Sequence, residues 1–306
     1  MRKIGFHGPP SCTWVPVAVR HSDPHPSNQP LTHALSGANP ETVTLNVPDR
    51  LIRADQLAES AQIRVRVMDG PISRQDGRVT RTIEDLFPPF GVTITCGPLS
   101  MRPLRESDAP GFEDAVRTHG IYDDGRVMPF LTPWADAGDR IGVNLLQRLL
   151  WSNWATFSPD QWQLPFRVEF EGRFVGVQDV FTRTPFLATR TLETGSWLLR
   201  PEQGRGTGTL MRQAVCAFAF DDLGAERMAS GAFLGNERSL GVSRKVGYVP
   251  NGVHRLPQPD GEGWREELQL LLTPDAFVRP SDPVVCTGVD AFRRFIGLDA
   301  ESDAPS

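Results

Sequence analysis

Three glycines within five residues mark the part of this sequence best suited to bind an anion. An apolar run at 196–199 precedes them and predicts a strand, and apolar residues spaced three and four apart from Leu210 to Phe218 predict a helix after them. Glycines let the backbone approach a ligand closely, and the unpaired N–H groups of the first helical turn point at it. We therefore expect a phosphate-binding turn at Gln203, Gly204, Arg205, Gly206, Thr207, Gly208 and Thr209.

Two familiar phosphate-binding motifs fit this turn poorly. A P-loop requires Gly-Lys-Ser/Thr, whereas Gly208 is followed by Thr209 and Leu210. A dinucleotide-binding loop requires a third glycine, but Met211 or Thr209 stands there, depending on where the count begins. A nucleotide-dependent oxidoreductase is therefore disfavoured, while a glycine-rich turn without a ligand stays as an alternative.

The spacing Gln-x-x-Gly-x-Gly at 203–208 instead resembles the pyrophosphate loop of the GNAT superfamily of N-acetyltransferases. Asn-Glu-Arg-Ser at 236–239 and Gly-Tyr at 247–248 are similar to two later segments of the family, and residues 99–108 are similar to the opening strand of its RimJ/RimL-like subgroup. The resemblance spans residues 83–275. It implies an α+β (mixed α/β) fold, in which helices flank a central, mostly antiparallel, twisted sheet.

The resemblance also implies a co-substrate, acetyl-CoA, and an activity, transfer of its acetyl group to a primary amine of a small molecule or a protein N-terminus. Residues 203–209 would hold the pyrophosphate, and Asn236 would meet the pantetheine arm, with a helix N-cap as its structural alternative. Main-chain groups would pair with that arm like an added strand at Leu198, Leu199 and Arg200. A catalytically weak GNAT module that binds acyl-CoA for regulation is the alternative function.

Catalysis by direct attack of an amine needs a base and a proton donor. The resemblance makes Glu193, ahead of the strand at 194–197, the first candidate base. It makes Ser239 and Tyr248 candidate donors, although a packing role suits Tyr248 as well. The tyrosine that many relatives carry after Ser239 is missing, since Leu240, Val242 and Ser243 fill that stretch.

Two further residues are weaker candidates for the base. Glu169 lies between apolar neighbours on a predicted strand, and His254 follows the predicted strand at 248–253. Acceptor recognition is the least readable part of the sequence. The segment 128–163 is rich in aromatic residues, which would form core or line an acceptor pocket, and core is favoured.

The remaining pattern predicts how these residues are positioned. Strands are expected at 99–104, 166–170, 174–180, 227–233, 248–253 and 267–272, and helices at 136–156 and 236–246. Residues 1–82 are expected to form a largely disordered or poorly defined extension, with short strand-like stretches at 43–47 and 63–67. Residues 83–275 form the predicted GNAT domain, and 276–306 form a tail with a helical segment at 289–296.

Composition limits the possible partners. The net charge of −5 disfavours nucleic-acid binding, and no apolar run is long enough to span a membrane. The four cysteines are widely spaced, which suits free thiols in a cytoplasmic protein. His21 and His25 flank Pro24, which prevents the helix that would align them on a metal, so no metal site is expected. The expected partner is a small-molecule or peptide amine, and the expected state is a monomer or homodimer.

Overall fold

A computed structural model describes residues 44–47, 50–53, 73–75, 78–122, 129–130, 133–258 and 263–299. The chain divides into two compact units, residues 1–67 and residues 68–306. In the first unit, β1 (Thr44–Val47) and β2 (Arg50–Arg53) form an antiparallel hairpin. The strand predicted at 63–67 and the disorder predicted up to about residue 40 lie outside the described residues.

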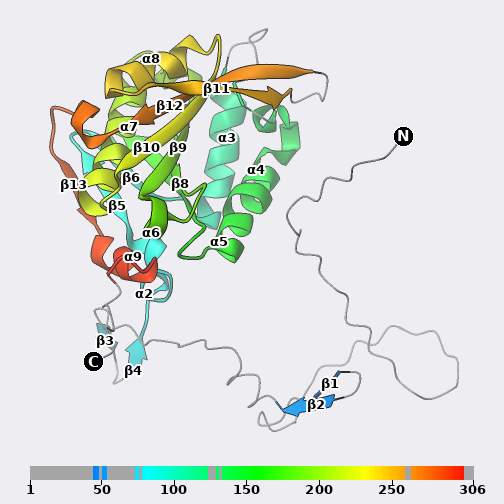
Figure 1. The fold of residues 1–306 in the computed structure, drawn as a ribbon. Helices are drawn as coiled ribbons and strands as arrows, with labels where there is room; N and C mark the ends of the chain where they lie inside the picture. Colours follow the sequence, from blue (N-terminus) through cyan, green and yellow to red (C-terminus); the bar gives the residue numbers. More distant parts are fainter. Residues whose placement is uncertain are drawn as a thin grey trace, which may run out of the picture. The chain divides into compact units, whose positions relative to one another are not determined.

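A nine-stranded sheet organises the second unit (Figure 1). Its order is β11-β12-β10-β9-β8-β7-β6-β5-β13, and every neighbouring pair is antiparallel except β9 and β10. The mostly antiparallel sheet predicted from the sequence is thus confirmed. The strands are β5 (Thr93–Cys96), β6 (Leu99–Pro103), β7 (Gln163–Phe170), β8 (Arg173–Phe181), β9 (Thr191–Leu198), β10 (Arg227–Phe233), β11 (Val249–Pro257), β12 (Trp264–Leu272) and β13 (Val284–Thr287). A separate short hairpin joins β3 (Ser73–Gln75) and β4 (Arg78–Thr80).

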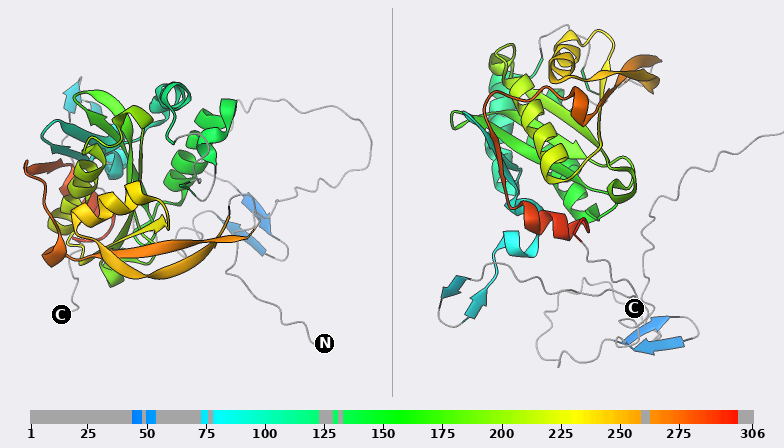
Figure 2. Two further views of the ribbon diagram at one scale, coloured as in Figure 1. Left: turned by 90° about the horizontal axis from the view of Figure 1, so that it is seen from above. Right: turned by 60° about the vertical axis from the view of Figure 1, so that its left-hand side comes forward.

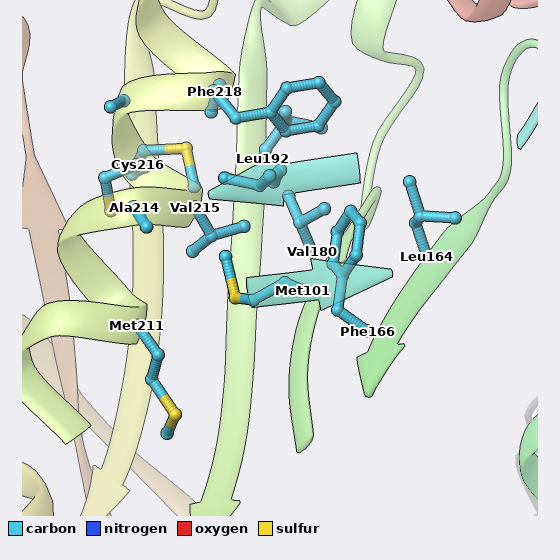
Figure 3. Close-up of a cluster of buried hydrophobic side chains, with 14 of the residues drawn as sticks. Met101, Leu164, Phe166, Val180, Leu192, Met211, Ala214, Val215, Cys216 and Phe218 are labelled. Carbon is cyan, nitrogen blue, oxygen red and sulfur yellow. The ribbon is translucent and has the colours of Figure 1, made fainter. Parts of the chain in front are cut away.

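Helices cover both faces of this sheet and create two buried clusters. The larger cluster contains the apolar face of α7: Met211 and Val215 of this helix, and Phe218 directly after it, point at the strands in Figure 3. The smaller cluster contains side chains of α3 and α4. The helices are α2 (Ile83–Leu86), α3 (Ala109–His119), α4 (Ile141–Asn144), α5 (Ser152–Thr156), α6 (Phe186–Thr189), α7 (Thr207–Ala217), α8 (Glu237–Val246) and α9 (Val289–Phe295).

Stretches of π-helix and of 3-10 helix change the bounds of the predicted helices. A π-helical stretch at 145–151 joins α4 to α5, so that the helix predicted at 136–156 runs from 141 to 156 after two short 3-10 turns. Another π-helical stretch, at 218–222, extends α7. The helix predicted at 236–246 is confirmed as α8, which ends at Gly247 with φ of 105°. Such a left-handed conformation favours glycine at the end of a helix.

The C-terminal part of the described chain contributes to the same sheet and core. The sequence did not predict β13, which pairs antiparallel with β5 at the sheet edge. The helix α9 follows it, and Phe292 and Ile296 are fully buried in the larger cluster. Figure 2 shows α9 beside the segment that contains α2, and Phe87 and Phe295 pack there with ring centroids 5.5 Å apart.

The parallel pair β9–β10 is short, and this creates the opening of the site. Its only Cα partners in the described chain are Thr191 with Arg227, Leu192 with Met228 and Glu193 with Ala229. Beyond Glu193 and Ala229, β9 continues to pair with β8, and β10 continues to pair with β12. The two strands therefore separate, and a gap opens between them toward the glycine-rich loop.

Candidate active site

A cavity of about 1110 Å³ lies over this gap. The glycine-rich loop and the first turn of α7 line one end, through residues such as Gly204 and Gly206. The separated parts of β9 and β10 line its middle, and α3, α4 and α8 contribute further walls. Asp179 of β8 and Glu267 of β12 also line it, so loop, gap and carboxylates belong to one continuous space.

The loop has the conformation that its glycines allow. Gly204 and Gly206 have φ values of 78° and 93°, and no atom lies within 4 Å of a β-carbon built on either residue. Glycine is favoured at both positions by backbone conformation, not by crowding. Gly206 is also the N-cap of α7, and the amides of 204–208 donate to no main-chain acceptor in the described chain. These amides can point at an anion, as expected for a pyrophosphate seat.

Hydrogen bonds of the Gln203 side chain stabilise the loop. Its Nε2 donates to the carbonyl oxygens of Leu198 and Ile121, and its Oε1 accepts from Arg238 of α8. The Gln203 side chain therefore connects the end of β9, the segment after α3 and the start of α8. In this arrangement the side chain holds the loop's shape, and ligand binding by the main-chain amides of the loop stays a prediction.

The main chain at 198–200 already forms hydrogen bonds within the protein. The amide of Leu199 donates to Val175, and the amide of Arg200 donates to Gly120. The carbonyl of Leu198 accepts from Gln203. The carbonyls of Leu199 and Arg200 accept from the amides of Glu202 and Gln203. Pairing of this stretch with an extended ligand arm stays a prediction.

Asn236 caps α8 and lines the cavity at the same time. Its Oδ1 accepts from the amide of Ser239 at 3.2 Å, so the structural role foreseen for it is present. Ser239 lines the cavity too, on the first turn of α8. Their roles toward a ligand stay predictions.

Two carboxylates that the sequence analysis did not single out reach the cavity. Glu267 of β12 lies over Gly231 of β10, where an added β-carbon would stand 2.6 Å from its carboxyl carbon. Burial raises the pKa of Glu267, the hydrogen bond from Gln269 lowers it, and the charge of Glu193 raises it. A carboxyl group with a raised pKa at a cavity wall is a candidate general base.

Asp179 is the second of these carboxylates. Its Oδ2 accepts from Nε2 of Gln163 at 3.0 Å, and its Oδ1 is buried with no hydrogen-bond partner among the described residues. Burial raises the pKa of Asp179 to about 7, because the single hydrogen bond from Gln163 offsets little of the desolvation. Asp179 pairs in register with Gly195 of β9, so no side chain on that neighbour covers it.

Glu193 lies inside β9, whereas the sequence analysis placed it ahead of a strand. Both of its carboxylate oxygens accept from Arg183, at 3.0 and 3.2 Å. Glu193 is absent from the residues that line the cavity, although its charge acts on Glu267.

The position of Glu267 in the sequence alone could not reveal that it lines the cavity, because β12 comes to the gap only through pairing with β10.

Three other predicted candidates lie outside the cavity lining. Tyr248 is 4% exposed, and its hydroxyl lies 3.5 Å from the Cys216 sulfur beneath α7. Burial raises the pKa of Tyr248 well above its usual value. Glu169 accepts from Arg167 on the same strand, and His254 lies on the exposed strand β11 opposite Glu267.

The aromatic residues of 128–163 divide between core and cavity. Trp154 packs with the core, Trp162 is buried in it, and Trp151 is half exposed. Trp134 and Phe130 line the cavity, with ring centroids 5.6 Å apart. Trp134 also packs against Trp197 of β9 at 5.4 Å. These rings pack against the smaller buried cluster and form an aromatic wall of the cavity at the same time.

Residues 99–249 match the family model described as the acetyltransferase (GNAT) domain. The chain therefore contains a GNAT domain, and acetyl-CoA is the co-substrate of this family. Within the described ranges, no three His, Cys, Asp or Glu residues cluster as metal ligands do. No helix in them is long and apolar enough to cross a membrane.

Individual relatives are distant. A Bacillus subtilis (strain 168) protein named "Putative ribosomal N-acetyltransferase YdaF" is 32% identical over 66 residues, which are 22% of this chain and 36% of that protein. RimJ of Mycobacterium smegmatis, solved with a CoA disulfide, is 20% identical and covers 61% of this chain and 88% of its own, with a TM-score of 0.48. RimL, a ribosomal L7/L12 α-N-protein acetyltransferase solved with coenzyme A, is 16% identical over 58% of this chain and 96% of its own, with a TM-score of 0.45.

Proposed function

We propose that this protein transfers the acetyl group of acetyl-CoA to a primary amine that enters the cavity beside Asp179 and Glu267. The observation that carries the proposal is the continuity of one cavity from the loop amides to these two carboxylates. The loop end offers main-chain donors to a pyrophosphate. The other end offers carboxylates and an aromatic wall, which suit a protonated amine attached to an apolar group.

Glu267 is the proposed base. An amine arrives largely protonated at neutral pH and must lose a proton before its lone pair can attack the thioester. The raised pKa of Glu267 brings this carboxyl group closer to working pH than an ordinary glutamate. Glu193, held by Arg183, supports this role by placing a negative charge near Glu267. Asp179 is proposed to hold the incoming ammonium, because its free Oδ1 lacks a donor.

Thiol release from acetyl-CoA tests the proposal, measured over a panel of amines and N-terminal peptides. At least one amine acceptor should release free thiol at a rate that saturates with both substrates, and mass spectrometry should find the acetylated amine. Calorimetry with acetyl-CoA, desulfo-CoA and NADH runs beside it. Binding of NADH without acetyl-CoA would contradict the loop assignment. Binding of acetyl-CoA without transfer to any amine would favour the regulatory module.

A further inference from the structure

The cavity contains a buried cation that no carboxylate of the described residues neutralises. Arg212 of α7 is 3% exposed and lines the cavity. Among the described residues, Nε of Arg212 has no hydrogen-bond partner, and the Arg212 side chain forms no ion pair with a carboxylate. A buried unpaired charge costs several kcal/mol of desolvation, so one that persists calls for an anion that the resting protein lacks.

Two serines hold the guanidinium in the gap between β9 and β10. Nη2 of Arg212 donates to Oγ of Ser196 on β9 at 2.9 Å, and Nη1 donates to Oγ of Ser230 on β10 at 3.1 Å. Ser230 directly follows Ala229, the last residue of β10 that pairs with β9. Because each hydroxyl accepts from Arg212, each keeps its own proton to donate elsewhere. One cation and two O–H donors thus meet where the strands separate.

The side chains around Arg212 do not supply the missing charge. Its charge acts on Cys216 and on Tyr248, whose ring centroid lies 5.9 Å from the guanidinium carbon. Burial raises the pKa of Cys216 to about 11 and that of Tyr248 above its usual value, so both groups stay neutral. The cavity carboxylates Asp179 and Glu267 form no ion pair with Arg212 in the described chain.

The pyrophosphate seat is also separate from Arg212. Arg212 follows Thr207, the first residue of α7, by five positions, which corresponds to roughly 7.5 Å along the helix axis. A ligand arm that leaves the loop and follows β9 past Leu198 comes next to Ser196, deeper in the gap. The reactive end of the co-substrate, its thioester, is therefore the part that would contact Arg212, Ser196 and Ser230.

We propose that Arg212, Ser196 and Ser230 form a site for the sulfur of coenzyme A and stabilise it as a thiolate when the thioester bond breaks. This proposal rests on the proposed function. Glu267 first passes the proton that it took from the ammonium to solvent. The lone pair of the neutral amine forms the C–N bond, the proton that this nitrogen then loses passes to Glu267, and the C–S bond breaks with its electron pair remaining on sulfur. Arg212 carries a permanent positive charge, so it neutralises the thiolate by charge and hydrogen bonding and donates no proton.

This assignment explains how the reaction proceeds without a tyrosine acid. Tyr248 lies outside the cavity lining, and Leu240 and Val242 occupy the stretch where a donor was sought. A leaving group that departs as a stabilised thiolate needs no protein acid at that moment. Arg212 is then a catalytic residue, and Ser196 and Ser230 position it.

The test is the pKa of the thiol in enzyme-bound coenzyme A, titrated through the ultraviolet absorbance of the thiolate. Free coenzyme A, titrated in the same way, gives the reference pKa of its thiol. We expect the wild-type complex to lower it by at least about one unit. Arg212→Met should remove this downward shift of the thiol pKa, and Arg212→Lys should keep part of the shift. Ser230→Ala should make the shift smaller. Wild type should also bind coenzyme A more tightly than desulfo-CoA as the pH rises, and Arg212→Met should not.

A purely structural Arg212 gives a different result. If Arg212 only ties β9 to β10, the bound thiol pKa is unchanged or raised in wild type and is the same in Arg212→Met, and the proposal is overturned. Arg212→Lys and Ser230→Ala keep the experiment decisive if Arg212→Met does not fold. Failure of the proposed function is distinguishable, since it appears as no binding of desulfo-CoA or no transfer to any amine. An active enzyme with an unshifted thiol pKa overturns this inference alone.

Discussion

The carboxyl group of Glu267 lies over Gly231, so closely that a β-carbon at position 231 would stand 2.6 Å from its carboxyl carbon. The two residues are on neighbouring strands, where Gly231 pairs with Gln269. Glycine at 231 therefore leaves the space that the Glu267 carboxyl group occupies at the cavity wall. The position of the proposed base on β12 therefore depends on the absence of a side chain on β10, the strand between β12 and β9.

Gly231→Ala should lower kcat through Glu267. The added methyl group displaces a flexible carboxyl group, so we expect little change in stability and a fall in kcat. Glu267→Gln should lower kcat by about 100-fold or more, within the usual range for loss of a general base. In the double variant the two effects should not add, because both act on one group. Additive losses in steady-state kinetics would show that Gly231 acts independently of Glu267.

The pH dependence of kcat/KM should report the same carboxyl group. A base acts only when deprotonated, so activity falls as the pH drops below its pKa. Because the pKa of Glu267 is raised, this fall should begin above the range of an ordinary glutamate. Glu267→Gln should abolish this acidic limb of the pH profile. Glu266→Gln should keep it, because Glu266, the preceding residue of β12, lies outside the cavity lining. A limb retained in Glu267→Gln would assign the base elsewhere.

Gly206→Glu should weaken acetyl-CoA binding by about 100-fold or more. A carboxylate at the N-terminus of α7 would face the pyrophosphate, and like charges brought together cost several kcal/mol. Gly224→Glu is the matched control, since Gly224 also has a positive φ and open space around it but lies outside the cavity lining. Calorimetry should find near-normal affinity in the control. Equal losses in both variants would indicate a general effect of strained backbone.

Asp179 should make the protein less stable as the pH rises. Its pKa is raised from 3.8 to about 7, so the folded state binds the proton more tightly than the unfolded state between these values. The free energy of unfolding therefore falls across this window, by up to roughly 4 kcal/mol at 1.36 kcal/mol per unit. Asp179→Asn should remove this fall, measured by chemical denaturation at pH 5 and pH 8. The exposed Asp160→Asn serves as control, and a slope unchanged in Asp179→Asn would contradict the prediction.

The segment after residue 275 should be required for a stable fold. Phe292 is fully buried, and Phe292→Ala should cost about 3–5 kcal/mol in unfolding free energy. Arg294→Ala, on an exposed position of the same helix, should change it by about 0.5 kcal/mol or less. Truncation after residue 275 should lower the melting temperature more than removal of 300–306. Equal melting temperatures would make the tail dispensable.

Much of the fold could be predicted because its signals are local. Period-2 and period-3.6 patterns located β7, β8, β10, α7 and α8, since each buries one face against a neighbour. Strand ends were less well predicted: β11 and β12 extend beyond their predicted bounds because they pair with each other. β13 carries a weak pattern of its own, and pairing with β5 makes it a strand.

The candidate site divides in the same way. The loop at 203–208 was readable because glycine spacing and the following helix determine its conformation locally. Glu267, Asp179 and Arg212 were not singled out, because isolated charged residues in a sequence resemble solvated surface residues. Their burial depends on which strands stand beside them.

By itself the sequence determined the loop and the helix that begins at Thr207, because backbone conformation and hydrophobic periodicity are properties of neighbouring residues. The mostly antiparallel sheet was implied by the resemblance to the GNAT family. Only the tertiary structure decided which charges face the gap between β9 and β10. That gap forms because two parallel strands pair over three residues and then separate, each held by another partner. Desolvation inside it raises the pKa of Asp179 and Glu267, which no local pattern can reveal.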